Sequence, residues 1–411
     1  MTAIPISLTL DPNDLPPGPV GPPGPVGPQG PQGNGYISVK DYGAIGNGIA
    51  DDTAAVQAAL SALNGGALWF PHGRYRSGPL NYPLGYARFT GDGIGATTLI
   101  PIDGASDFLT IGGSYVSISD MSIAPEVVCT SGALLRFQKG KIWINNIHVQ
   151  GGHSVIRFES DVSTYVSSCF LRDFKLDGIT YASGYVGWAF MNNVAISSSD
   201  NSGCGIRAES GDTFHWSNID ITACKIGVGL LPQASDKLYN VFATNITCDG
   251  VGRASSLPGW YLDSQQAGAE LKRIKLTNCW AGSMIHDGVF IRGASDVSLD
   301  NFISINNTLN GIHVISPVDN IRIQNSTVTR NGAGGPNNDG IRVEDGISGF
   351  QIQNNRCGPA DGINTQRYGV SVLGVAHDDY IITGNRFGGN VTGGLLDQGT
   401  GVQKIVGDNL L

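Results

Sequence analysis

The residues of this chain that could do chemistry begin with two acidic side chains placed directly before glycine. Asp287 and Asp339 share this position in two repeats of the chain, and a strand spacing of about 4.8 Å would set them ~9.6 Å apart. Hydrolysis of a glycosidic bond needs two carboxyl groups about 5 to 9.5 Å apart, one protonated and one ionised. The two aspartates are candidates for that pair, while Asp-Gly as an ordinary turn sequence is the structural alternative.

Other acidic side chains are candidates for the same role. Asp263 and Glu344 follow the same kind of repeat, and Glu209 lies close in sequence to Asp212. Cleavage by elimination would instead need a base and a cation that neutralises the carboxylate of an acidic sugar. The cations available in these repeats are Arg207, Arg292 and Arg342.

A glycine followed by alternating apolar residues recurs in eight repeats. This pattern predicts which side chains lie on one outer face of the molecule. If the residue after each glycine points inward, the next residue points to solvent, because side chains alternate along a strand. The first predicted outward column is Thr180, Arg207, Gly229, Tyr261, Phe290, His313, Arg342 and Ser371. The second is Glu209, Leu231, Asp263, Arg292, Ile315, Glu344 and Leu373.

These columns predict a binding strip. Exposed aromatic rings mixed with charged groups suit sugars, which have apolar faces and polar edges. The alternative is that the charges solvate the sheet and the rings pack against a loop or another subunit. The candidate binding residues are Tyr261, Phe290, Arg292, His313, Arg342, Arg207 and Glu209.

The elements that must position these residues are coils of a solenoid. A second phrase, apolar-x-apolar-x-Asn, recurs along the chain, and from Asn218 onward its asparagines are 23 to 33 residues apart, the length of one solenoid coil. Asparagine tolerates the left-handed conformation of a tight turn, so stacked asparagines would form a ladder with a structural role. Two strands per coil predict an all-β, single-stranded parallel β-helix. The asparagines are Asn146, Asn218, Asn245, Asn278, Asn301, Asn325 and Asn354.

The segment 36–100 predicts a cap and the first coils. Asp51 or Asp52 would begin a short helix whose apolar face is Val56, Ala59, Leu60 and Leu63. Ala67 to Phe70 then reads as a strand that stops at Pro71. Capping explains the adjacent aspartates better than catalysis does.

The succession V-K-D-Y-G-A-I-G-N-G, A-D-D-T, V-Q-A-A and G-G-A-L-W-F-P-H-G-R-Y in this segment resembles the opening of the pectate-lyase-like superfamily. That resemblance implies a right-handed β-helix, a fold shared by bacteriophage tailspikes, pectin-cleaving enzymes and alginate epimerases. Asn337-Asn-Asp-Gly is similar to the Asn-Thr-Asp-Gly segment of polygalacturonases, but the paired Asp-Asp and the His-Gly segment of that family do not follow. The Asp-Pro-His-Glu segment of alginate epimerases is also absent.

Five Gly-Pro-X triplets from Gly18 to Gln32 precede this domain. Only glycine fits at the crowded axis of a collagen triple helix, so the period predicts a homotrimer, with a stiff single-chain linker as the alternative. The predicted organisation is an attachment segment at 1–17, a collagen-like stem at 18–35 and a parallel β-helix domain at 36–411.

Composition excludes several classes of protein. The net charge of −9 gives no basic surface for nucleic acid, and no apolar run is long enough for membrane insertion. The first residues lack a signal peptide pattern. Seven scattered cysteines predict buried thiols rather than a disulfide framework. No acidic cluster has calcium-loop spacing, so no metal and no cofactor are expected.

The stem and the solenoid together look like a bacteriophage tailspike or short tail fibre. The resemblance implies a virion protein of the phage tail, assembled in the host cytoplasm, that binds and depolymerises (by hydrolysis) a bacterial surface polysaccharide. Other phage tail or baseplate proteins would bind the segment 1–17. Two alternatives stay open, a non-catalytic receptor-binding or structural trimer and a polysaccharide lyase.

Overall fold

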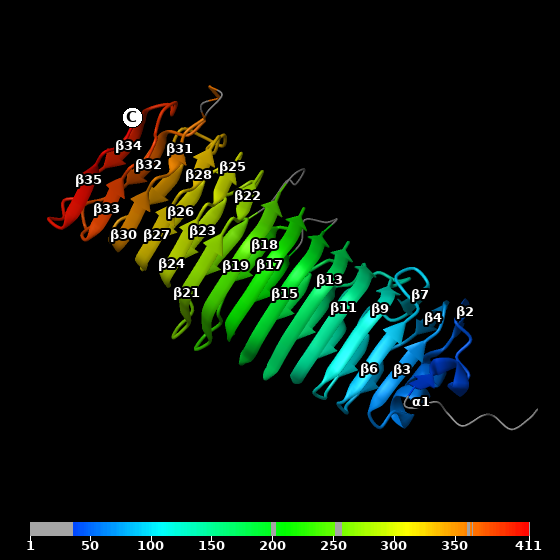
Figure 1. Cartoon of the computed structure of the whole chain (residues 1–411). Helices are drawn as coiled ribbons and strands as arrows, with labels where there is room; N and C mark the ends of the chain where they lie inside the picture. The colour runs from blue at the N-terminus through cyan, green and yellow to red at the C-terminus, as the bar shows by residue number, and fades with distance from the viewer. Residues whose placement is uncertain (1–35, 199–202, 251–256, 360–361, 364, 411) are drawn as a thin grey trace, which may run out of the picture. The chain divides into compact units, whose positions relative to one another are not determined.

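The computed structural model describes residues 36–198, 203–250, 257–359, 362–363 and 365–410. The chain divides into two units, Met1–Gly35 and Tyr36–Leu411. The predicted attachment segment, the collagen-like stem and the trimer that the stem implies lie outside the described residues and stay predictions. The second unit is an all-β, right-handed parallel β-helix, as predicted (Figure 1).

One long sheet of thirteen strands runs along the solenoid, and we call it sheet B. Each strand pairs in parallel with the equivalent strands of the neighbouring coils. Its strands are β5 (Leu80–Tyr82), β8 (Leu109–Ile111), β10 (Ala133–Phe137), β12 (Ser154–Phe158), β14 (Ile179–Tyr181), β16 (Cys204–Ala208), β18 (Ile226–Leu230), β20 (Trp260–Asp263), β23 (Val289–Arg292), β26 (Ile312–Ile315), β29 (Ile341–Val343), β32 (Tyr368–Val372) and β34 (Gly393–Asp397).

The remaining twenty-two strands form a second continuous sheet, which we call sheet A. They are β1 (Tyr36–Ser38), β2 (Asn47–Asp51), β3 (Gly66–Phe70), β4 (Gly73–Ser77), β6 (Ala87–Gly91), β7 (Thr97–Pro101), β9 (Val116–Ile123), β11 (Gly140–Gln150), β13 (Val162–Arg172), β15 (Val186–Ser197), β17 (Gly211–Thr222), β19 (Lys237–Asp249), β21 (Glu270–Thr277), β22 (Trp280–Gly282), β24 (Ala294–Asp300), β25 (Ile303–Ile305), β27 (Asp319–Gln324), β28 (Thr327–Thr329), β30 (Ser348–Gln353), β31 (Arg356–Cys357), β33 (Tyr380–Thr383) and β35 (Lys404–Gly407).

The asparagine of each repeat turns the chain within sheet A. All seven predicted asparagines have φ between 51° and 56°, in the left-handed region. Their side chains bond from coil to coil: Asn245 Nδ2 donates to Asn218 Oδ1 at 3.1 Å, and Asn301 Nδ2 donates to Asn278 Oδ1 at 2.8 Å. The predicted ladder is therefore present at these two steps, whereas Asn146 and Asn325 donate to Asp120 at 2.8 Å and to Asp300 at 2.9 Å instead. Apolar residues on either side of each bend fill one continuous core.

A second asparagine ladder lies inside the solenoid and was not predicted. Asn355 Nδ2 donates to Asn385 Oδ1, and Asn385 Nδ2 donates to Asn409 Oδ1, both at 3.0 Å. Asn355 and Asn385 are only 2% and 1% exposed. Because buried polar groups are stable only when they are hydrogen-bonded, each amide depends on the next coil for its partner.

The predicted cap is present as α1 (Thr53–Ala62), beside the short 3₁₀ helix η2 (Val39–Tyr42). Asp51 Oδ1 accepts the Thr53 backbone N–H at 2.9 Å, whereas the side chain of Asp52, the N-cap residue, makes no capping hydrogen bond with the helix. Asp52 instead accepts the backbone N–H groups of Ile45 at 2.7 Å and Gly46 at 3.1 Å. The apolar face of the helix is buried as predicted, at Val56, Ala59, Leu60 and Leu63.

All seven cysteines are buried thiols, as the sequence predicts. Burial raises the pKa of Cys169 and of Cys279 to about 12, and a thiol that stays protonated is unreactive. Among the described residues, no helix has the length and apolar character needed to cross a bilayer.

Candidate functional site

The first predicted outward column is one row of directly paired residues in sheet B. Tyr261 pairs with Phe290, Phe290 with His313, and His313 with Arg342 in successive strands β20, β23, β26 and β29. The same register runs from Thr180 of β14 to Ser371 of β32. The spacing of the glycine phrase alone therefore predicts which side chains stack on one another.

The side chains of this row are less exposed to solvent than the alternation of inward and outward residues predicts. Thr180 and Ser371 are buried, and Phe290 is only 8% exposed. The Tyr261 and Phe290 rings meet edge to face with centroids 5.2 Å apart, and Phe290 meets His313 in the same way at 5.6 Å. The rings therefore contact one another more than they face solvent.

Three predicted residues come together around His313. Its Nδ1 lies 3.2 Å from Asp287 Oδ2, and its Nε2 lies 3.1 Å from Glu344 Oε1. Arg342 Nε donates to the same Glu344 oxygen at 2.6 Å. The group is a continuous chain of alternating charges from a buried carboxylate to a half-exposed one, which we call the His313 cluster.

The charges in the His313 cluster shift each other's pKa values. Burial opposes the charged form of His313, but hydrogen bonds to Asp287 and Glu344 outweigh it and raise the His313 pKa. Burial likewise opposes ionisation of Asp287, yet hydrogen bonds from His286 and His313 hold the Asp287 pKa well below its usual range. Contacts with Arg342 and His313 lower the Glu344 pKa against its burial. The cluster therefore holds an imidazolium between two carboxylates.

Asp339 belongs mainly to a second network, which meets this cluster at Arg342, whose Nη1 lies 3.9 Å from Asp339 Oδ2. Arg367 grips it with two hydrogen bonds of 2.9 and 2.7 Å, and Ser371 Oγ donates to it at 2.6 Å. The Tyr368 backbone N–H is a further donor at 3.1 Å, and the Asp339 side chain is fully buried. These contacts describe a structural anchor, and the catalytic role predicted for Asp339 is untested.

The position before glycine has a common structural function. Asp287 Oδ1 accepts the Asn310 backbone N–H at 2.7 Å, and Asn310 Oδ1 accepts that of Asp339 at 2.8 Å. Asp177 accepts the Cys204 N–H at 2.8 Å in the same way. Each side chain thus ties its own turn to the turn of the next coil, which explains why aspartate and asparagine recur there.

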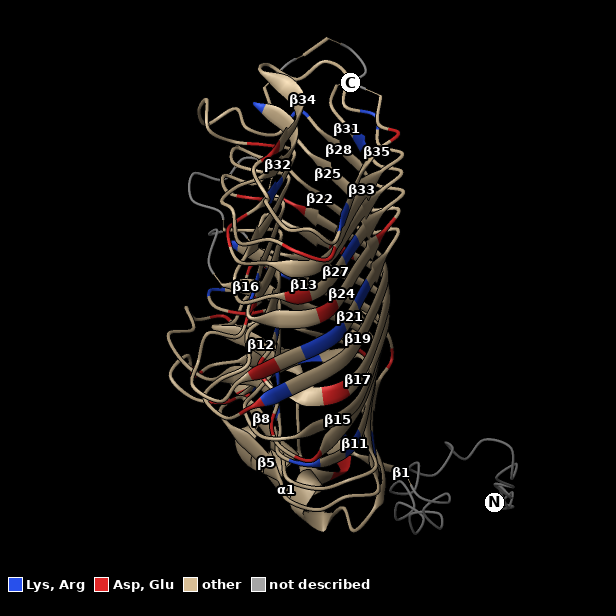
Figure 2. Cartoon of the chain, turned by 90° about the vertical axis from the view of Figure 1, so that its left-hand side faces the viewer, with Lys and Arg blue, Asp and Glu red and all other residues tan. Residues whose placement is uncertain are grey.

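The three arginines predicted to bind an acidic sugar already have carboxylate partners. Arg207 Nε donates to Asp177 at 2.9 Å, and Arg292 grips Asp263 with bonds of 3.0 and 2.6 Å. The third, Arg342, is bonded to Glu344 as described above. Glu209 accepts the Ser183 backbone N–H at 3.0 Å. Along the solenoid, acidic and basic residues are interspersed (Figure 2).

No three His, Cys, Asp or Glu side chains gather at a spacing that could hold a metal ion, within the part of the chain that the structure describes.

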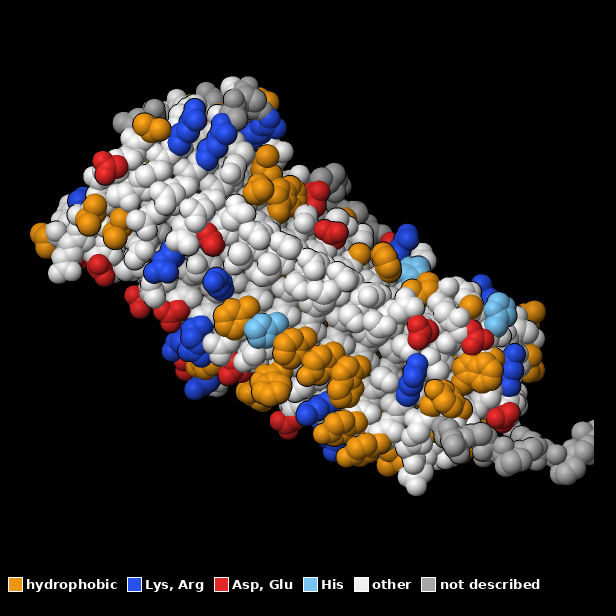
Figure 3. Space-filling view, in the orientation of Figure 1, with side chains coloured by type: hydrophobic (Ala, Val, Ile, Leu, Met, Phe, Trp, Pro, Cys, Tyr) orange, Lys and Arg blue, Asp and Glu red, His pale blue; other side chains and the backbone are white. Residues whose placement is uncertain are grey.

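A second candidate surface, which the sequence analysis missed, lies on the outer face of sheet A. Seven aromatic rings from seven strands or strand edges follow one another along the solenoid, with neighbouring centroids 5.1 to 6.2 Å apart. They form a visible band on the surface (Figure 3). We call this the aromatic stripe: Tyr86, Tyr115, Trp143, Tyr165, Phe190, His215 and Phe242.

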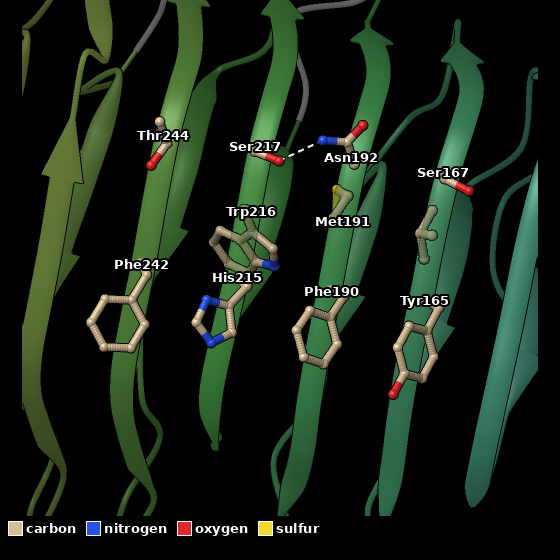
Figure 4. Close-up of a pocket in the computed structure, with 11 residues that line it drawn as sticks. Tyr165, Ser167, Phe190, Met191, Asn192, His215, Trp216, Ser217, Phe242 and Thr244 are labelled. Carbon is tan, nitrogen blue, oxygen red and sulfur yellow. Dashed lines mark hydrogen bonds between the residues drawn. The ribbon is translucent and has the colours of Figure 1, made fainter.

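A shallow groove of about 410 Å³ opens over part of the stripe (Figure 4). Its rings come from β13, β15, β17 and β19, and beside them runs a row of small polar side chains two residues further along each strand. In the groove, this polar row is Ser167, Asn192, Ser217 and Thr244. No aspartate, glutamate, lysine or arginine is among the residues that line the groove.

The stripe could have been read from the second phrase. Its rings are the residue between the two apolar members: Trp143 lies between Ile142 and Ile144, Phe190 between Ala189 and Met191, and Phe242 between Val241 and Ala243. The apolar members predict the core, and alternation along the strand places the residue between them on the outer face.

The comparisons with known proteins agree with this fold. Residues 36–235 match the model of the family described as rhamnogalacturonase A/epimerase, pectate lyase-like. The predicted resemblance to the pectate-lyase-like superfamily is confirmed.

Among curated proteins, the mannuronan C5-epimerase AlgE2 of Azotobacter vinelandii is 28% identical over 267 residues, which cover 57% of this chain and 25% of that protein. The chain thus spans about a quarter of the length of this relative. Among solved structures, the A-module of the Azotobacter vinelandii mannuronan C-5 epimerase AlgE6 has a TM-score of 0.59 at 17% identity, covering 91% of this chain and 98% of that one. The Dettilon tailspike protein has a TM-score of 0.55 at 15% identity, covering 88% and 68%. At these identities, the likeness of the solved structures shows the fold.

Proposed function

We propose that this protein binds a bacterial surface polysaccharide and depolymerises it by hydrolysis, in the manner of a tailspike. The His313 cluster carries the proposal, because it places a protonated group and ionised carboxylates together on the face of the coils. The relatives named as mannuronan epimerases support a polysaccharide as the substrate, and the tailspike among the solved structures shares the fold.

The geometry favours particular roles within the cluster. Glu344 is 29% exposed and ionised, so it is the carboxylate that can reach a substrate or activate a water molecule. His313, with 15% of its side chain exposed and a raised pKa, is the proposed proton donor, and the substrate oxygen would replace Glu344 as the acceptor of its Nε2–H. Asp287, which is 1% exposed, would hold the imidazole in place rather than touch the sugar.

The proposed roles differ from those predicted for the pair Asp287 and Asp339. A hydrolase needs one group that stays protonated and can act as the acid, but the pKa of Asp287 is lowered rather than raised. The proposed acid is therefore His313. The predicted roles of Asp287, Asp339 and Asp263 as catalytic acids remain hypotheses that the same assay tests.

The test is release of reducing ends from purified bacterial surface polysaccharides. We expect the wild-type protein to cleave one of them, and Glu344→Gln to lower the rate by about 10²-fold or more, the range of a general acid–base contribution. Glu159→Gln is the matched control, because Glu159 is also ion-paired beside sheet B but directly follows β12, remote from the cluster. Asp287→Asn, Asp339→Asn and Asp263→Asn complete the series.

Each result has a definite meaning. Equal cleavage by the wild type and Glu344→Gln would move the active site elsewhere. Release of unsaturated chain ends, measured by ultraviolet absorbance, would replace hydrolysis by lyase chemistry. Binding of a polymer without any cleavage would replace the enzyme by a receptor-binding protein.

A further inference from the structure

We propose that the aromatic stripe, together with its polar row, is a binding surface for an uncharged polysaccharide chain, separate from the His313 cluster. The inference rests on the proposed polysaccharide function and adds a second site and a ligand class to it. Five consecutive coils each contribute one ring to a single row of directly paired residues. These rings are Trp143, Tyr165, Phe190, His215 and Phe242.

The rings present a usable apolar surface. Adjacent planes from Trp143 to His215 are within 9° of parallel, with centroids 5.1 to 5.4 Å apart. Rings in this offset arrangement overlap only in part, so a portion of each face stays uncovered, and the faces are turned outward in Figure 4. Phe242 is 38% exposed and Trp143 is 36% exposed. Their repeat is close to the length of one sugar unit in an extended chain.

The polar row supplies the second half of sugar recognition. Asn192 Nδ2 donates to Ser217 Oγ at 2.6 Å, and Asn145 Nδ2 donates to Ser167 Oγ at 2.8 Å. Each hydroxyl oxygen that accepts such a bond keeps its own O–H to donate. Sugar hydroxyl groups lie at the edge of an apolar ring face, so a chain lying on the stripe would meet donors and acceptors along one side.

The absence of basic side chains from the groove favours an uncharged polysaccharide over other polymers that stack on aromatic rings. Single-stranded nucleic acid needs a basic groove along its phosphates, whereas this groove has no lysine or arginine and the protein carries a net charge of −9. The same lack of cations disfavours an acidic polysaccharide. Along this row, cations lie only beyond the two ends of the groove. Lys275 follows Phe242 in the row by one coil, and Arg88 precedes Trp143 by two coils. At that same end of the stripe, Lys141 Nζ lies 5.5 Å from the centre of the Tyr115 ring.

A second copy of the chain fits the surface less well. A dry protein interface would bury the hydroxyls and amides of the polar row, and each without a partner would cost stability. A sugar chain brings hydroxyl groups of its own to every coil.

Serine substitutions test the surface without disturbing the fold. Ser117 and Ser298 occupy the same row in other coils, so Phe190→Ser and Phe242→Ser introduce a residue that the solenoid already accepts there. The control is Ile405→Ser, which removes an exposed apolar side chain from the far end of the row. Binding to neutral and acidic polysaccharides is measured by calorimetry and by quenching of tryptophan fluorescence.

We expect the wild type to bind a neutral polymer, the double variant Phe190→Ser/Phe242→Ser to bind it about tenfold more weakly or worse, and Ile405→Ser to bind it unchanged. Equal binding by the wild type and the double variant would overturn the stripe but leave the proposed function standing. Binding of acidic polymers alone would overturn the ligand class. If the wild type binds no polymer, both proposals fail. Dissociation of an oligomer by the double variant in sedimentation would identify the stripe as an interface between copies, and overturn the proposal.

Discussion

The outer faces of sheets A and B both carry rows of side chains stacked from coil to coil, but the two rows differ in exposure and in charge. On sheet B, the row that contains His313 and Arg342 is half-buried, and its charges are paired with carboxylates. On sheet A, five of the seven rings of the aromatic stripe are exposed and Tyr165 and Phe190 are half-buried, and the residues lining the groove include no carboxylate, lysine or arginine. A row of stacked side chains can therefore stabilise the coils or remain available to a ligand, and the partners of each side chain decide which.

The largest effect should come from breaking the sheet B network at its most buried point. Asp339→Asn removes the ionised partner of Arg367, and loss of one partner of a buried pair costs about 3 to 5 kcal/mol. Because Arg367 itself is 21% exposed, we expect about 3 kcal/mol. Guanidinium denaturation gives the global change, and hydrogen exchange at Tyr368, whose N–H bonds Asp339, gives the local one.

Asp263→Asn is the matched control for this prediction. Its pair with Arg292 is 13% and 34% exposed, and the loss should be about 1 kcal/mol or less. Equal losses for the two variants would show that burial does not distinguish these networks.

The His313 cluster should make stability depend on pH. The pKa of His313 is raised in the folded protein, so the stabilisation is fully present below about pH 6.5, the pKa of an unfolded histidine. It is lost as the pH rises through the folded value. We expect the wild type to lose stability as the pH rises above about 6.5, and His313→Gln to show a smaller loss over the same range. Parallel denaturation curves for both proteins at each pH would contradict the assignment.

The smallest effect is expected on the stripe itself. Phe190→Ser removes an outward ring from a row that already contains serine, so the free energy of unfolding should change by about 0.5 kcal/mol, as for other surface substitutions. Thermal denaturation of this variant beside Asp339→Asn compares the two faces directly. A loss as large as that of Asp339→Asn would show that the rings stabilise the coils, and the contrast between the two faces would disappear.

The repeats in the sequence predict most of the fold for a physical reason. Two alternating phrases per coil determine which residues point inward, so the core, the left-handed asparagines and the row from Thr180 to Ser371 follow from counting. Seven consecutive pairings in that row are as predicted.

The candidate site is less predictable, because it depends on which side chains of neighbouring coils contact one another. Alternation shows that Phe290 points outward, but not that neighbouring groups leave it 8% exposed. Likewise, the sequence shows that Asp339 precedes a glycine. It does not show that Asp339 is hydrogen-bonded to Arg367, because the two residues are 28 positions apart and meet only when the coils are folded. The inner ladder of Asn355 and Asn385 was missed because asparagine was expected only at outer turns.

The parallel pairing of successive coils also has a mechanical meaning. The coils are joined in series, so a pull along the solenoid axis loads every junction with the same force, and the narrowest junction opens first. Within sheet A, β17 and β19 share ten paired positions, whereas β30 and β33 share four. Under tension along the axis, the coils at β30 and β33 should separate before those in the middle of the rod.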